Sequence, residues 1–129
     1  MKIFQGPIEL DMQKFTNGLK AAEGMDGAGM ILVHNGIVRA NDLSGNTVEK
    51  IDVKVDAERL EAILNQTAGM EGIIAVDAWI VEGTLSVGQD IMLLGVAGNT
   101  RGNVIPALSS ALDAIKAGVT SKKQYKYIV

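Results

Sequence analysis

Two basic residues, fifteen positions apart, are the side chains of this chain best suited to chemistry. Arg101 follows a glycine-rich segment, and Lys116 comes shortly before Gly118. Apolar residues recur between them at helical spacing, so we expect one amphipathic helix with Arg101 near its start and Lys116 in its last turn. Free N–H groups at a helix start favour an anion, and a guanidinium adds to that preference. The pair therefore predicts an anion-binding site.

Each of these residues also has an ordinary structural explanation. A glycine-rich strand-to-helix turn is usually only a turn, and segment 95–102 lacks the Gly-Lys-Ser/Thr ending of a Walker-type phosphate loop. A lysine in a last helical turn commonly interacts with the terminal carbonyl groups. His34, the only histidine, lies in a strand pattern, where a lone histidine is more often packed or exposed than catalytic. Residue chemistry alone predicts no more than an anion-binding domain.

The pattern of apolar residues predicts the elements that hold these side chains. The helix is preceded by a buried strand over 91–96 and contains Pro106, which a helix tolerates only in its first turn. Two earlier helices are expected after the N-caps Asp11 and Asp56, each with a hydrophobic staple. The first has an apolar stripe beginning at Met12 and ends at Gly24. Strands are expected at 2–5, 30–38, 48–55, 73–81 and 125–129, with a bulge or a close backbone approach at Gly36 and a turn at Glu82-Gly83.

The order of these elements lacks a strict alternation of strands and helices. It therefore predicts an α+β fold with a mixed or mostly antiparallel sheet and three helices, organised as a single domain over residues 1–129.

Composition narrows the function classes. The net charge of −3 argues against nucleic acid as the main partner, although Lys122, Lys123 and Lys126 crowd the C-terminus and allow a local anion site. The chain has no cysteine, which excludes disulfides, thiol catalysis and zinc–thiolate sites. No apolar run approaches the ~20 residues of a membrane span, and no secretion signal is visible, so we expect a cytoplasmic protein with no metal, cofactor or membrane partner.

Four segments in order give the chain a family resemblance. GMILVHNGIVR, EGTLSVGQ, NTRGNVIPALSSALDAIK and a final KK pair together resemble the large, catalytic subunit of molybdopterin synthase. The agreement covers nearly the whole chain, and its spacing is more specific than its identities. The resemblance implies an α/β-hammerhead-like sandwich that forms a homodimer, and a heterotetramer with a small subunit.

The same resemblance implies an activity and a set of site residues. In the family, a small ubiquitin-like sulfur carrier ending in Gly-Gly brings a thiocarboxylate to the large subunit, and sulfur passes to a cyclic pyranopterin monophosphate to form molybdopterin. By position, Lys116 resembles the catalytic lysine and Lys123 its partner. The residues expected to bind the substrate and its anionic groups are Arg39, Arg101, Thr100 and His34.

The chain departs from the family pattern near these positions. Thr100 stands where the family has a histidine, and His34 stands where it has a phenylalanine. The closing motif around Lys123 is also changed. A second hypothesis, of a different class, is therefore a non-catalytic paralogue that keeps the dimer and the anion pocket.

The spacing of Arg101 and Lys116 also predicts an assembly. Fifteen residues of helix separate their Cα atoms by roughly 22 Å, whereas each side chain reaches only about 6–7 Å. One small substrate cannot readily touch both within one subunit. We therefore expect a two-fold dimer, in which Arg101 of one chain completes the pocket that holds Lys116 of the other.

Overall fold

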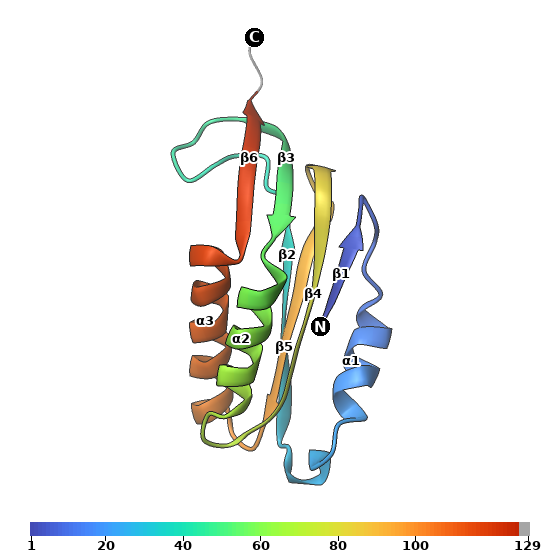
Figure 1. Ribbon diagram of the computed structural model, residues 1–129, viewed down its shortest axis with the longest axis vertical. Helices are drawn as coiled ribbons and strands as arrows, with labels where there is room; N and C mark the ends of the chain where they lie inside the picture. Colours follow the sequence, from blue (N-terminus) through green and yellow to red (C-terminus); the bar gives the residue numbers. More distant parts are fainter. Residues whose placement is uncertain (127–129) are drawn as a thin grey trace.

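A twisted sheet with helices on both faces organises the chain (Figure 1). The computed structural model describes the backbone of residues 1–126 and the side chains of residues 1–120. In chain order the elements are β1 (Lys2–Gln5), α1 (Met12–Lys20), the 3-10 turn η1 (Met25–Gly27), β2 (Met30–Ile37), β3 (Val48–Val55), α2 (Ala57–Ala68), β4 (Ile73–Ser86), β5 (Asp90–Gly98), α3 (Arg101–Gly118) and β6 (Thr120–Lys126). This order and the mixture of helices and strands confirm the α+β prediction.

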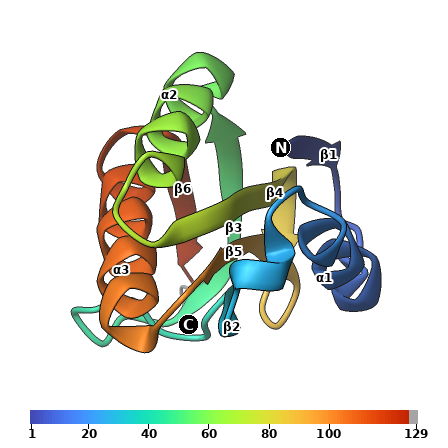
Figure 2. The same cartoon turned by 90° about the horizontal axis from the view of Figure 1, so that it is seen from below.

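The long strand β4 joins the two halves of the sheet. The strand order is β2-β5-β4-β3-β6, and β1 also pairs with β4. β4 runs antiparallel to β5 over its first half and to β3 over its last residues. The β1–β4 pair is parallel, so the sheet is mixed, as expected. Helices α2 and α3 pack together on one face, and α1 covers the other (Figure 2).

Local sequence signals determine where two helices begin. The Asp11 carboxylate accepts a hydrogen bond from the backbone N–H of Lys14 at 3.0 Å, and that of Asp56 accepts one from Arg59 at 3.1 Å. Each aspartate therefore occupies one of the donors that a helix start leaves without a partner. The expected staple residue four positions inside each helix, Phe15 or Leu60, is fully buried.

The end of α1 differs from the prediction. The helix stops at Lys20 rather than at Gly24, because the Ala21 N–H still bonds to the Asn17 carbonyl but the Ala22 N–H bonds to that of Leu19, three residues back, which ends the α-helical pattern. Gly24 has a φ of +85° and instead leads into η1. Met12, expected on the buried stripe, is the first residue of the helix and is 40% exposed.

The expected turn at Glu82-Gly83 is wrong. β4 continues through both residues to Ser86, and the reversal occurs at Gly88, whose φ is +87°. The glycine at position 83 serves a close approach: a Cβ there would lie 3.0 Å from the carbonyl oxygen of Gly6. The Gly6 N–H donates to the Glu82 carbonyl at 2.8 Å, which holds the two backbones together.

The start of α3 relative to Pro106 and the start of β6 also differ from the prediction. Pro106 is the sixth residue of α3, beyond the first turn. Gly102, four residues earlier, is exposed, so the carbonyl left without a donor by proline faces water. β6 begins at Thr120 instead of 125, because the Val119 carbonyl accepts from the Asp56 N–H at 2.8 Å and aligns the chain with β3. Residues 127–129 of the predicted strand lie outside the described residues.

The core lies between the sheet and the helices. β5 is buried over nearly its whole length, as its apolar run predicts. α3 presents the expected stripe to it, with Val104, Ala111 and Ile115 buried and Leu112 partly buried. The β2–β5 register shifts after Gly36, which confirms the predicted bulge. No helix in the described part of the chain has the length and apolar character needed to cross a membrane.

Candidate functional site

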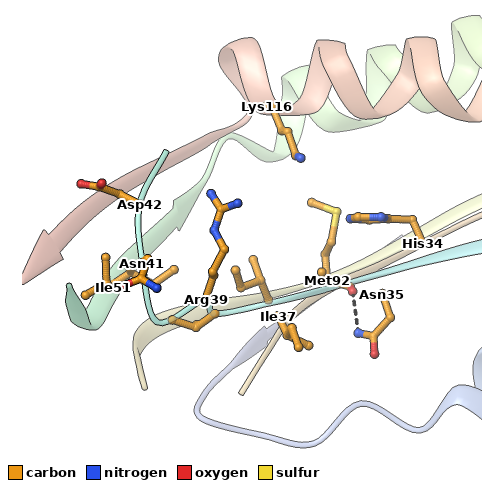
Figure 3. Close-up of a pocket in the computed structure, with 13 residues that line it drawn as sticks. His34, Asn35, Ile37, Arg39, Asn41, Asp42, Ile51, Met92 and Lys116 are labelled. Atoms are coloured by element: carbon orange, nitrogen blue, oxygen red, sulfur yellow. Dashed lines mark hydrogen bonds between the residues drawn. The ribbon is translucent and has the colours of Figure 1, made fainter. Parts of the chain in front are cut away.

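A cavity of about 470 Å³ lies between the C-terminal end of α3 and the sheet. The end of β2 and the segment after it form one wall, β3 and β5 contribute apolar side chains, and α3 contributes Lys116 (Figure 3). Three of the six predicted site residues line this cavity: His34, Arg39 and Lys116. The fold thus brings together residues that lie up to 82 positions apart in the sequence.

Two cations point into the cavity from opposite sides. Lys116 lies in the last turn of α3 and extends toward the sheet, while Arg39 extends from the segment after β2 toward the helix (Figure 3). The two charges are far apart in the sequence and come from the end of a helix and from the segment that follows a strand. A guanidinium and an ammonium that face one small space suit a ligand with one or more anionic groups.

The carboxylate that borders the cavity is held by its own loop. Asp42 accepts hydrogen bonds from the backbone N–H groups of Ser44 and Asn46, both at 2.9 Å, and from the Asn46 side chain at 3.2 Å. The Gly45 N–H also donates to the Asp42 carbonyl, which closes a tight turn. Asp42 therefore shapes the cavity rim by ordering residues 42–46.

The sheet supplies the floor of the cavity at the bulge in β2. His34 and Met92 project from β2 and β5 on the side that faces α3 (Figure 3). Gly36 lies between them, and a Cβ at this position would be 3.2 Å from both His34 Nε2 and Met92 Cγ. The glycine therefore lets the imidazole lie flat along the strand surface.

The other two predicted residues on α3 lie at its opposite end. Arg101 is the first residue of the helix and Thr100 is its N-cap. The Thr100 hydroxyl makes no capping hydrogen bond. Because α3 is one continuous helix, the rise of 1.5 Å per residue again separates Arg101 from Lys116 by roughly 22 Å. Within one chain, the structure does not bring them together.

Lys123 is placed only by its backbone. It lies in β6 opposite Asp52 of β3, and its side chain is outside the described residues. Its role beside Lys116 therefore stays a prediction. Among the described residues, no group of three or more histidine, cysteine, aspartate or glutamate side chains is arranged to hold a metal ion.

Asp42 and Met92 are among the cavity residues that sequence reasoning missed. Asp42 is signalled by its own turn, since aspartate followed three residues later by glycine is typical of a type I turn. Met92 is the cross-strand partner of Gly36 and needs the β2–β5 register to be found. The first signal was available in the sequence, and the second depends on a pairing between distant strands.

The fold and the cavity together define a class: an α+β protein with a helix end and a strand end supplying cations to one small cavity. A model of the MoaE protein family matches residues 8–118, most of the chain. The chain belongs to the MoaE family. This membership confirms the resemblance seen in the sequence, and with it the assignment to molybdenum cofactor biosynthesis.

Solved structures agree with this fold. The molybdopterin synthase of Staphylococcus aureus is similar with a TM-score of 0.79 and 20% identity, over 99% of this chain and 92% of that one. A molybdopterin biosynthesis MoaE protein from Burkholderia ambifaria is similar with a TM-score of 0.75 and 19% identity, over 98% of this chain and 87% of that one. A chain in a complex of subunits 1 and 2 of the Helicobacter pylori molybdopterin-converting factor is similar with a TM-score of 0.73 and 19% identity, over 98% of this chain and 84% of that one. No curated protein sequence matches the chain significantly.

Proposed function

We propose that this chain acts, as one domain, as the catalytic large subunit of a molybdopterin synthase. It would transfer sulfur from the thiocarboxylated Gly-Gly terminus of a small ubiquitin-like partner to a cyclic pyranopterin monophosphate. The observation that carries the proposal is the meeting of Lys116 and Arg39 in one cavity. We place the reaction in the cytoplasm, where sulfur nucleophiles are kept reduced.

The two cations suit the two anions of this reaction. Arg39 presents a planar fork of donors that can bind a phosphate or a carboxylate through two hydrogen bonds. Lys116 presents a compact positive charge, which stabilises negative charge that develops on the reacting group. Lys123 is assigned beside Lys116 on the family resemblance alone.

We assign Arg101 and Thr100 to the site of the second chain in a homodimer. Both lie at the start of α3, roughly 22 Å from Lys116 by helical rise, which exceeds the combined reach of two side chains. A two-fold axis brings the start of α3 in one chain to the end of α3 in the other and forms two such sites at once. A small subunit bound to each site completes a heterotetramer. The two-subunit assembly from Helicobacter pylori supports a partner of this kind.

Sulfur transfer by variants of Lys116 tests the proposal. Lys116→Ala should lower the yield of molybdopterin by about 100-fold or more, in line with the loss of one charge-stabilising group in an active site. Stability should change by no more than about 0.5 kcal/mol, because the side chain is exposed. Lys20→Ala is the matched control, since Lys20 is an exposed lysine in the last turn of α1. Equal product from wild type, Lys116→Ala and Lys20→Ala would contradict a catalytic role for the cavity.

One observation favours a second candidate function. Thr100 stands at the family's histidine position and cannot move a proton near neutral pH. A non-catalytic paralogue would bind inorganic pyrophosphate in a Lys116-dependent manner and yet form no molybdopterin. Calorimetric titration of the wild type and of Lys116→Ala, run beside the sulfur-transfer assay, separates the two functions.

A further inference from the structure

His34 is the one described side chain of the cavity whose charge ordinarily changes near neutral pH. The other ionisable residues of the lining are Lys116, Arg39 and Asp42. His34 is also the only histidine in the chain. Any proton transfer by a side chain of this wall near pH 7 therefore falls to its imidazole.

The position of the imidazole fits a role toward a ligand. His34 is half-buried and faces the same space as Lys116 and Arg39 (Figure 3). Its Nε2 lies beside Gly36, where a Cβ would come within 3.2 Å. Position 36 has no side chain, so on the β2 side the ring packs against the backbone of Gly36. The neighbour contributed by β5, Met92, does not titrate.

The proposed reaction needs a proton acceptor after the first bond forms. When a thiocarboxylate sulfur displaces an oxygen substituent from a substrate carbon, the C–S bond forms as the C–O bond breaks, and that sulfur is then bonded both to the substrate carbon and to the acyl carbon of the partner's tail. The product of this step is a thioester. Water must then attack the acyl carbon to release the tail, and a water molecule near neutral pH is a weak nucleophile without a base.

We infer that His34 is the general base that releases the partner's tail, an inference that rests on the function proposed above. The imidazole takes a proton from water as its oxygen bonds to the acyl carbon. The acyl–sulfur bond then breaks, the tail leaves as a carboxylate, and the sulfur stays on the substrate as a thiol that takes the remaining hydroxyl proton. The imidazolium returns its proton to solvent, so no oxidant or reductant is required.

The charged groups around His34 support this order of events. Lys116 from α3 and Arg39 from the segment after β2 both face the cavity and stabilise the oxyanion that forms when water adds to the thioester. Asp42, the carboxylate of the rim, accepts three hydrogen bonds from residues 44 and 46 of its own loop. The two cations stabilise the oxyanion, and the imidazole takes the proton from the attacking water.

A single-turnover experiment tests the inference. The thiocarboxylated small subunit is mixed with the cyclic pyranopterin phosphate and with wild type, His34→Gln, His34→Phe or Lys116→Ala, and the thioester between tail and substrate is followed by mass spectrometry. His34→Gln should still form the thioester, and it should release the tail about 100-fold more slowly than the wild type. Wild-type release should rise with pH between about 5 and 8, and release by the variant should lose this dependence.

Three results would overturn the inference that His34 is the general base. Wild-type release kinetics and pH dependence in His34→Gln would exclude the imidazole as the base. Slower formation of the thioester, with normal release, would assign His34 to binding instead. Failure of the wild type to form any thioester would contradict the proposed function itself, and this inference with it. Thermal unfolding checks each variant, and His34→Phe, which carries the residue of the family pattern, replaces His34→Gln if the latter does not fold.

Discussion

Mixing two inactive variants gives the sharpest test of the shared site. Arg101→Ala and Lys116→Ala are each expected to lower sulfur transfer by about 100-fold or more, because each removes one cation from every site of a symmetric dimer. In a heterodimer, the chain with intact Lys116 meets the chain with intact Arg101, so one site is complete and the other lacks both cations.

The geometry sets the size of the recovery. The two residues lie at opposite ends of α3, and about 22 Å of helix exceeds the combined side-chain reach of about 13 Å by roughly 9 Å, so a single chain cannot supply both. Random reassociation of equal amounts makes about half of the dimers heterodimers, each with one good site. The mixture should therefore regain about one quarter of wild-type activity per chain.

The assay is molybdopterin formation after the variants are mixed under mild denaturant and refolded together. A matched control mixes Arg39→Ala with Lys116→Ala. Both of these residues line the same cavity of one chain, so each site of that heterodimer lacks one of them and no activity should return. Recovery in the control, or none in the test mixture, would refute the shared site, as would a strictly monomeric wild type.

Two further predictions concern ligand binding and stability. Crystals grown in sulfate should hold an anion between the Arg101 guanidinium and the first backbone N–H groups of α3, and an empty helix start with Arg101 in solvent would contradict this site. Gly95→Ala should destabilise the protein by about 1–3 kcal/mol in denaturant unfolding, because the new Cβ would lie 2.5 Å from Leu19 Cδ1 and 2.7 Å from Phe15 Cε2, both buried. Gly18→Ala is the control: it lies in α1 with nothing within 4 Å of its Cβ, so it should raise stability by about 0.5–1 kcal/mol, and equal effects at both positions would contradict the packing argument.

Local interactions made several features of this protein predictable from its sequence. The caps at Asp11 and Asp56 depend on residues three to five positions away, so the sequence itself shows where α1 and α2 begin. The same is true of the bulge at Gly36 and of α3, whose apolar stripe shows that one helix separates Arg101 from Lys116. The family resemblance rests on the same kind of short-range spacing.

Contacts between distant segments decided the rest. Gly83 looks like a turn residue in the sequence, but its role is set by the approach of Gly6, which is far away along the chain. His34 and Arg39 come to share a cavity with Lys116 because β2 pairs with β5 and α3 then packs back across that pair. The sequence by itself determined which residues carry charge and which helix holds two of them. Only the tertiary structure decided which of them face one cavity, because strand pairing and helix packing depend on the whole core and not on any local pattern.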